Sequence, residues 1–364
     1  MKIMRTRKVG RIVVISLALM LVVAGCNSAK SNTSGDNAQP AATGSGAAEK
    51  ETLRIGFYAP IVMDWFDSVK KGCDQFASEY GAEIEYQFGP AESGSQAIQD
   101  ELMEAMAAKG IRNFLVYPEN PSASNATYRE FKNIGSNIVN YGGDTEQPTP
   151  ASFFVGLDVY EASKARMQRT VDDLGGKGNI ITAYQDAADP MVAVGRSAYN
   201  GVIDATPGCT LLQELSDLNS AEMATAKFAD ALSANFGKID AIVVYGQQVS
   251  VGLANALKEY YASNPDADLI YVIGSNIMPE VLESVRAGYT TYTTADIPEG
   301  YGYIGCSLLA HLRDGWVPRD GVYKIIMPEI YVNKDNVDSF ENDIRQIQAD
   351  MVAKIETEYM IKAN

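Results

Sequence analysis

The sequence predicts an α/β fold with two similar lobes, each built on a parallel β-sheet that helices cover on both faces. Its 364 residues suffice for two domains of ordinary size. The composition, with 46% hydrophobic and 21% charged residues, is that of a globular protein. Short β-branched or aromatic runs alternate with longer segments of helical period in two series of similar length, which is typical of parallel sheets wound by helices.

The first series contains five predicted strands, with helices between the first four. The helices are expected near 64–80, 94–109 and 122–134, and the first of them carries an apolar stripe at helical spacing. The strand runs are LRIGFYA (53–59), AEIEYQF (82–88), NFLVYP (113–118), NIVNYGG (137–143) and FFVGLD (153–158).

The second series repeats this rhythm, again with helices between its strands. Its runs are NIITAY (179–184), TLLQEL (210–215), AIVVYG (241–246), LIYVIGS (269–275) and YTTYTTAD (289–296). The glycine-rich stretch LGGKGN (174–179) precedes a strand instead of opening a helix, so we interpret it as a turn and not as a phosphate-binding loop. Ligands of open α/β sheets bind outside the carboxyl ends of the strands, so the polar residues after each strand are the first candidates for function.

The amino terminus has the features of a secretory signal. Residues 1–11 carry five basic and no acidic side chains, and an apolar run of thirteen residues follows at 12–24. As a helix this run would rise about 20 Å, short of the ~30 Å hydrocarbon core that a spanning helix must cross. A permanent transmembrane anchor is therefore not expected.

The end of the apolar run, Val23-Ala24-Gly25-Cys26, resembles the bacterial lipobox. The resemblance implies a signal peptide at 1–25 and a diacylglyceryl group on Cys26, which would attach the protein to the extracytoplasmic face of the cell membrane through lipid alone. The alternative is a plain signal peptide with an incidental cysteine. Residues 27–50 hold no large apolar side chain, so 26–52 is expected to be a flexible tether behind the lipidated cysteine.

Charge and residue usage exclude several function classes. A net charge of -16 repels phosphate backbones, so no nucleic-acid partner is expected. Cys73, Cys209 and Cys306 show no CxxC spacing and are predicted to be small buried hydrophobes; one disulfide among them stays open, and nothing selects the pair. The single His311 is predicted to be structural, and no catalytic motif accompanies it, so we expect no enzyme, no metal site and no cofactor.

Several segments together resemble a known family. They are the lipobox, the tether, LRIGFYAP followed by DWFDSVKKGCDQFASEYGAEIEY, and the later VIGSN and TTADIPEGYGYIG. In order and spacing they resemble the ribose-binding-like class of bacterial ABC-transporter solute-binding proteins, over the whole chain from Leu53. The ending MPEIYVNKDNVDSF is similar to the autoinducer-2 and rhamnose-binding branch of that class.

The resemblance implies the type I periplasmic-binding-protein fold, in which two Rossmann-like lobes are joined by three crossing strands and hold a sugar between them. The N-terminal lobe would comprise 53–157 plus 297–325, and the C-terminal lobe 158–296 plus 326–364. The crossings would then fall near Asp158, Asp296 and Ile325.

Trp65 and Phe66 lie where the family has its stacking aromatics. Sugars present flat C–H faces and a rim of hydroxyls, so their sites pair an aromatic ring with planar hydrogen-bonding side chains. Phe66 belongs to the apolar stripe of its helix, so a core position is the alternative for it. Trp65 lies ~100° away around the helix, off that stripe, and is the preferred stacking residue.

Three further contacts are expected from the second half of the chain. Arg196, in DPMVAVGRSAYNG, matches the family arginine that reaches hydroxyls, and its planar fork suits paired oxygens; a solvated helix arginine is the alternative. Asn276 follows VIGS and Asp296 ends TTAD, where the family has planar hydrogen-bonding residues. Both could also cap helices, because a proline follows each of them within three residues.

The same pattern adds Tyr117, near the end of the predicted strand 113–118, and Gln247 and Asn219, which come after the predicted strands 241–246 and 210–215. Asp144 is the last of the expected ligand contacts. It lies in a segment whose sequence differs from the family pattern. Many sugar-binding members have an Asp-Arg pair after the fourth strand, whereas this chain reads Tyr141-Gly142-Gly143-Asp144. The ligand therefore stays open among pentoses, hexoses, deoxysugars, polyols and autoinducer-like furanoses.

The resemblance implies a monomeric binding protein that captures a sugar-like molecule by hinge closure and delivers it to the permease and ATPase subunits of an ABC importer. Ligand that contacts both lobes would stabilise the closed state. The alternative is a sensor that, with ligand bound, docks on a membrane receptor or histidine kinase. The sequence does not separate transport from sensing.

Overall fold

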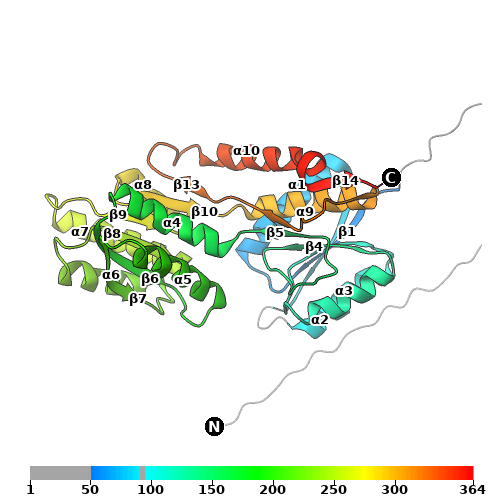
Figure 1. Cartoon of the computed structure of the whole chain (residues 1–364), viewed down its shortest axis with the longest axis horizontal. Coiled ribbons are helices and arrows are strands. Elements are labelled where there is room, and N and C mark those ends of the chain that lie inside the picture. Colours follow the sequence, from blue (N-terminus) through cyan, green and yellow to red (C-terminus); the bar gives the residue numbers. More distant parts are fainter. Residues whose placement is uncertain (1–50, 91–94, 364) are drawn as a thin grey trace, which may run out of the picture. The chain divides into compact units, whose positions relative to one another are not determined.

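The computed structural model describes residues 51–90 and 95–363 and contains two six-stranded sheets flanked by helices (Figure 1). The first sheet has the order β12-β5-β4-β3-β1-β2 and the second β13-β10-β9-β8-β6-β7. All neighbouring strands in the two sheets are parallel except β10 and β13. The predicted α/β fold with two parallel-sheet lobes is confirmed.

The strands of the first sheet are β1 (Arg54–Ala59), β2 (Glu83–Phe88), β3 (Asn113–Val116), β4 (Asn137–Tyr141), β5 (Phe153–Gly156) and β12 (Lys324–Ile326). Those of the second are β6 (Gly178–Tyr184), β7 (Cys209–Leu215), β8 (Ala241–Tyr245), β9 (Tyr271–Gly274), β10 (Tyr292–Ala295) and β13 (Ile330–Val332). Each of the ten strands predicted from the sequence is present, with ends within three residues of the expected ones.

The helices with the first sheet are α1 (Asp64–Tyr80), α2 (Gln96–Ala108), α3 (Ser124–Asn133) and α9 (Pro298–Arg313). Those with the second are α4 (Val159–Asp173), α5 (Pro190–Asp204), α6 (Ala221–Ala234), α7 (Gln247–Ser263) and α8 (Pro279–Ala287). The chain ends with α10 (Phe340–Ala353), the π-helix η1 (Ile355–Tyr359) and β14 (Met360–Lys362), which pairs with β11 (Trp316–Pro318). None of the described helices is both long and apolar enough to cross a membrane.

Strand β1 shows why the first sheet lies between two layers of helices. Ile55 and Phe57 pack into one apolar cluster with α1 and α9, while Tyr58 packs into another beneath α2 and α3. All three side chains are fully buried. A strand that is apolar on both faces needs cover on both sides, which the helices supply.

Helices α1 and α9 approach so closely that two glycines are required at their contact. A Cβ atom on Gly72 would lie 1.8 Å from the carbonyl oxygen of Glu299, and one on Gly302 would lie 2.0 Å from that of Val69. Only residues without a side chain allow the two backbones to touch in this way. This contact fixes α1, which carries Trp65, against the helix that follows Asp296.

The chain passes between the sheets at the three predicted crossings. It leaves the first sheet after β5 and returns to it after β10, and the third crossing runs from β12 to β13. At that third crossing Met327 N donates a 2.9 Å hydrogen bond to the carbonyl of Gly156 at the end of β5. The lobe boundaries given from the sequence stay a prediction.

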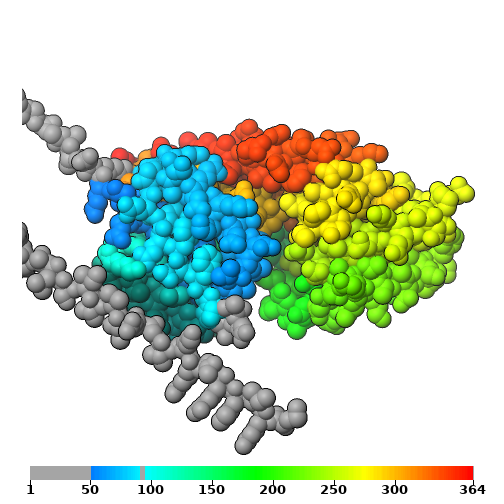
Figure 2. Space-filling model, turned by 180° about the vertical axis from the view of Figure 1, so that it is seen from behind, coloured from blue at the N-terminus to red at the C-terminus, as the bar shows by residue number. Residues whose placement is uncertain are grey.

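The C-terminal segment passes between the two lobes a fourth time. After β13 the helix α10 packs on α9, and Gln348 Nε2 lies 3.4 Å from Gln75 Oε1 on α1. Figure 2 shows this segment in red, next to N-terminal residues in blue and α8 in yellow. Helix α10 thus contacts α9 of the first lobe as well as β13 of the second sheet, and β14 pairs with β11 next to α9.

Both ends of the described chain attach to the end of α9 and the residues just after it. Arg313 Nη1 donates to the carbonyl of Glu51 at 3.1 Å, and Ala363 N donates to the carbonyl of Gly315 at 3.0 Å. The predicted signal peptide, the lipidation site Cys26 and nearly all of the tether lie outside the described residues.

Candidate functional site

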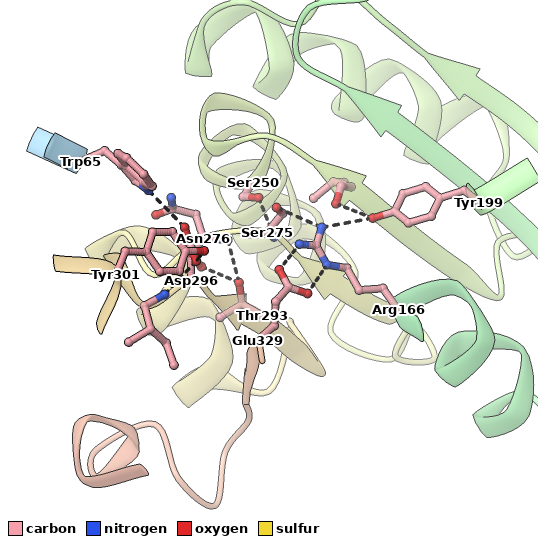
Figure 3. Close-up of polar contacts among 12 residues, drawn as sticks. Trp65, Arg166, Tyr199, Ser250, Ser275, Asn276, Thr293, Asp296, Tyr301 and Glu329 are labelled. Atoms are coloured by element: carbon pink, nitrogen blue, oxygen red, sulfur yellow. Dashed lines mark hydrogen bonds and ion pairs between the residues drawn. The ribbon is translucent and has the colours of Figure 1, made fainter. Parts of the chain in front are cut away.

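Asp296 lies at the second crossing, directly after β10, where the carboxyl end of the second sheet meets the first lobe. Trp65, in the first turn of α1, donates a hydrogen bond from its indole Nε1 to Asp296 Oδ2 at 3.1 Å (Figure 3). The two residues stand 231 positions apart in the chain. The fold thus brings together two residues that the sequence singled out.

Four aromatic rings surround the indole of Trp65. The ring of Tyr141 is nearly parallel to it, at 13° with centroids 6.3 Å apart, whereas Phe66, Tyr117 and Tyr301 present edges. Phe66 is buried in the core of the first lobe, as its place on the apolar stripe indicated. Sequence reasoning did not select Tyr141 and Tyr301, although Tyr141 lies in the predicted strand 137–143 and is the last residue of β4.

The indole occupies space that a side chain at position 142 would need. A Cβ atom on Gly142 would lie 2.6 Å from Trp65 Cη2, and the φ angle of this residue is +68°, in the left-handed region. The Gly142-Gly143 sequence, where the family pattern has an Asp-Arg pair, therefore makes room for the aromatic cluster.

Asp296 accepts three hydrogen bonds. Besides Trp65, Ile297 N donates to Oδ1 at 2.8 Å, and the hydroxyl of Tyr301 donates to the same oxygen. Burial raises the pKa of Asp296 above its ordinary value, and the nearby Glu329 carboxylate adds to this rise, while the three hydrogen bonds oppose it. Since a carboxylate offers about four acceptor positions, one remains for a further donor.

Arg166 of α4 forms a buried network that the sequence analysis did not foresee. Its Nε donates to Glu329 Oε2 at 2.9 Å, and one terminal nitrogen donates to Oε1 of the same carboxylate (Figure 3). The other terminal nitrogen lies 3.3 Å from Ser275 Oγ and 3.4 Å from the hydroxyl of Tyr199. Burial alone would lower the pKa of Arg166, but Glu329 and Tyr199 raise it well above its ordinary value.

Asn276 follows β9 and is held through its backbone. Its N–H donates to Thr293 Oγ1 at 3.2 Å, and its carbonyl accepts a hydrogen bond from the same hydroxyl. The preceding residue, Ser275, donates from its N–H to Ser250 Oγ at 2.9 Å. These contacts fix the loop without using the side-chain amide of Asn276.

A cavity of 470 Å³ is lined by residues of both lobes. Tyr117, Gly142 and Asp144 contribute from the first lobe, and Met191 and Val194 of α5 contribute from the second. The cavity therefore includes two of the predicted ligand contacts, Tyr117 and Asp144.

The two predicted residues in this cavity have different electrostatic surroundings. Burial raises the pKa of Tyr117, so its hydroxyl remains a donor at neutral pH. Asp144 Oδ1 accepts a 2.6 Å hydrogen bond from the hydroxyl of Tyr323, and its Oδ2 lies 3.5 Å from Lys324 Nζ.

Three predicted residues do not join this group. Arg196 pairs with Glu214 of β7, with Nε donating to Oε2 at 2.9 Å, and it lines a separate cavity of 250 Å³. Gln247 is exposed at the start of α7, with Nε2 3.2 Å from Met278 Sδ. Asn219 is exposed in the connection between β7 and α6. Their roles as ligand contacts stay predictions.

Across residues 51–90 and 95–363, no group of three or more His, Cys, Asp or Glu side chains could hold a metal ion. Cys73, Cys209 and Cys306 are buried and free, in agreement with their predicted role as small apolar residues. His311 lies in α9, with Nδ1 2.7 Å from the carbonyl oxygen of Ser307 and Nε2 3.1 Å from Glu356 Oε1. These contacts fit its predicted structural role.

Comparison with known proteins gives a family match over most of the described chain. Residues 57–315 match the model of the periplasmic binding protein domain. The xylitol-binding protein of Mycolicibacterium smegmatis is 24% identical over 298 residues, and the alignment covers 81% of this chain and 81% of that protein.

Solved structures share the fold at low sequence identity. A sugar-binding protein of a sugar ABC transporter from Bacillus halodurans has a TM-score of 0.65 at 18% identity, covering 79% of this chain and 99% of the other. A periplasmic solute-binding protein from Actinobacillus succinogenes with bound D-allose has a TM-score of 0.64 at 17% identity, with 79% and 99% covered. An arabinose binding protein from Geobacillus stearothermophilus has a TM-score of 0.63 at 18% identity, with the same coverage.

These relatives are solute-binding proteins and not enzymes, as the sequence analysis predicted. The family match extends from within β1 through α9. It includes the aromatic cluster around Trp65 and most strands of both sheets, but not β12 and β13. The fold is the type I fold of the sugar-binding solute-binding proteins of ABC transporters. The chain belongs to the periplasmic binding protein family.

Proposed function

We propose that the protein captures a sugar or polyol between its two lobes and delivers it to the permease of an ABC importer. The observation that carries this proposal is the contact of Trp65 with Asp296, because it places a flat aromatic ring beside a buried acceptor where the two lobes meet. An aromatic face and a few planar polar groups are what a carbohydrate site requires.

The surrounding residues supply the remaining hydrogen bonds. Asp296 keeps one acceptor position, Asn276 has an amide that both donates and accepts, and the hydroxyl of Tyr117 is a donor. Two of the relatives reported above are named for xylitol and arabinose, and a third was solved with bound D-allose. All three ligands are uncharged molecules with several hydroxyls. A ligand that contacts residues of both lobes favours the state in which they are closed around it.

Calorimetric titration of the purified protein with xylitol, D-allose and arabinose tests the ligand class. We expect one of these or a close analogue to bind at a single site and to raise the melting temperature. Trp65 and Trp316 are the two tryptophans of the chain, so Trp316→Phe isolates the fluorescence of Trp65 and should leave affinity unchanged. If no sugar or polyol binds, the carbohydrate part of the proposal fails.

The delivery step and the cellular location of the protein belong to the same proposal. We propose that Cys26 carries the lipid anchor, that the folded body works as a monomer outside the cytoplasm, and that permease and ATPase subunits are its partners. Deletion of the gene should abolish uptake of the labelled ligand, and Cys26→Ser should release the protein from the membrane fraction. Intact uptake with loss of a ligand-induced transcriptional response would instead indicate a sensing role.

A further inference from the structure

Arg166 and Glu329 form a buried ion pair that the proposed ligand contacts do not explain. Arg166 lies about two turns into α4, and Glu329 lies in the third crossing between β12 and β13. Their side chains are 4% and 6% exposed. Burying two charges is costly, and an apolar pair of similar volume is often at least as stable, so stability alone does not account for the pair.

The remaining donors of Arg166 reach two neighbouring strand ends. One terminal nitrogen lies within hydrogen-bond distance of Ser275 Oγ, just after β9, and of the hydroxyl of Tyr199. That hydroxyl in turn lies 3.3 Å from the carbonyl of Val244 in β8. As Figure 3 shows, the guanidinium lies between Glu329 of the third crossing on one side and Ser275 and Tyr199 on the other. Its planar fork fixes the directions of all these contacts at once.

The strand end after β9 carries one of the proposed ligand contacts. Ser275 directly precedes Asn276, whose backbone is already held by Thr293. Arg166 adds a contact to the Ser275 side chain, so the direction of the Asn276 amide depends on where the guanidinium is held. Glu329, Ser275 and Tyr199 take four of the five N–H donors of the guanidinium, and the Arg166 side chain is 4% exposed, so little of it is open to a ligand.

We infer that Arg166 and Glu329 are positioning residues of the ligand site: the pair holds the end of β9 in the geometry in which Asn276 meets the ligand, and neither residue contacts the ligand. The inference rests on the proposed function, because it assigns the pair to the same site.

Titration with xylitol, D-allose and arabinose tests the inference in three variants. Arg166→Met/Glu329→Leu replaces the ion pair by apolar side chains of similar size, and Arg166→Lys keeps the charge but loses the fork. We expect at least a tenfold rise in Kd for the double variant with its melting temperature retained, and a smaller rise for Arg166→Lys. The matched control is Lys164→Met, a half-exposed residue of the same helix, which should bind as the wild type does.

A second measurement needs no ligand. The side-chain amide signal of Asn276 in a ¹⁵N NMR spectrum should shift in the double variant and in Arg166→Lys, whereas that of the exposed Asn219 should not. Wild-type affinity in a folded double variant, or an unmoved Asn276 signal in Arg166→Lys, overturns the inference. If the wild type binds none of the three probes while the Asn276 signal shifts, the proposed ligand class fails and the positioning role stands.

Discussion

The indole N–H of Trp65 donates to the carboxylate of Asp296, and this hydrogen bond joins a helix of the first lobe to the strand end of the second sheet. The same carboxylate also binds the hydroxyl of Tyr301, which belongs to the helix packed against α1. The stacking residue and the acceptor of the proposed site are therefore oriented by a direct hydrogen bond to each other. Such preorganisation lowers the cost of ligand binding, because fewer side chains must be ordered.

Trp65→Ala and Trp65→Phe should separate the two roles of the indole. Removal of the ring should weaken ligand binding by about tenfold or more, equivalent to about 1.4 kcal/mol. Phenylalanine keeps an aromatic face but leaves Asp296 Oδ2 without its donor, which should lower the free energy of unfolding by about 1–3 kcal/mol. Titration calorimetry and urea denaturation measure the two effects. A Trp65→Ala variant with full affinity would remove Trp65 from the site.

Asp296→Asn should change how stability depends on pH. Because burial raises the pKa of Asp296, the folded protein binds this proton more tightly than the unfolded chain does. The stabilising contribution is complete below the ordinary Asp pKa of about 3.9 and is lost as the pH rises through the folded-state value. The wild type should therefore lose stability relative to Asp296→Asn as the pH rises from about 4 towards neutrality.

Denaturation of both proteins at a series of pH values measures this difference. Tyr301 and Glu329, the titratable groups that face Asp296, are present in both proteins, so their own ionisation is shared. A stability difference that stays constant with pH, or that changes in the opposite direction, contradicts the raised pKa.

Gly142→Ala should disturb the aromatic cluster specifically. The new Cβ atom would lie 2.6 Å from Trp65 Cη2 at a residue with positive φ, so both strain and a clash are expected. Gly135→Ala is the matched control, since its φ of +79° imposes similar strain with no atom within 4 Å. Both variants should lose about 1 kcal/mol or more of stability from backbone strain, but only Gly142→Ala should alter Trp65 fluorescence and ligand affinity. If Gly142→Ala and Gly135→Ala have the same Trp65 fluorescence spectrum, the clash of the new Cβ atom with Trp65 is excluded.

Gly72→Ala should destabilise the protein through the contact between α1 and α9. Its Cβ atom would lie 1.8 Å from a backbone oxygen of α9, so the helices must separate, at a cost of about 3 kcal/mol or more. Gly201→Ala, in α5 with no atom within 4 Å, should instead stabilise by about 0.5–1 kcal/mol through helix propensity. Thermal denaturation of the two variants distinguishes these directions. A Gly72→Ala variant as stable as the wild type would show that the helices adjust freely.

The main strands and the first three helices could be predicted because each is long enough to show its period and is bounded by turn residues. The pairing of β11 with β14 could not, because strands of three residues show no period and their partners lie far apart in sequence. The packing of α10 on α9 could not be predicted either, since an amphipathic pattern does not state which element the apolar face contacts.

Within the candidate site, Trp65 was predictable because a large ring off the apolar stripe of its own helix needs another partner. Arg166 was not, because an arginine on a polar helix is ordinarily solvated and only the fold supplies Glu329, 163 positions away. For Arg196 the opposite holds. Its sequence context suggested a ligand contact, but its side chain forms an ion pair with Glu214 that the sequence analysis did not foresee.

Both ends of the folded body are attached near Arg313 and Gly315, on the lobe that carries Trp65. A membrane attachment that enters at Glu51 would therefore hold this lobe at the cell surface. Under the proposed hinge closure the other lobe would turn towards it, so anchoring and ligand capture would not oppose each other.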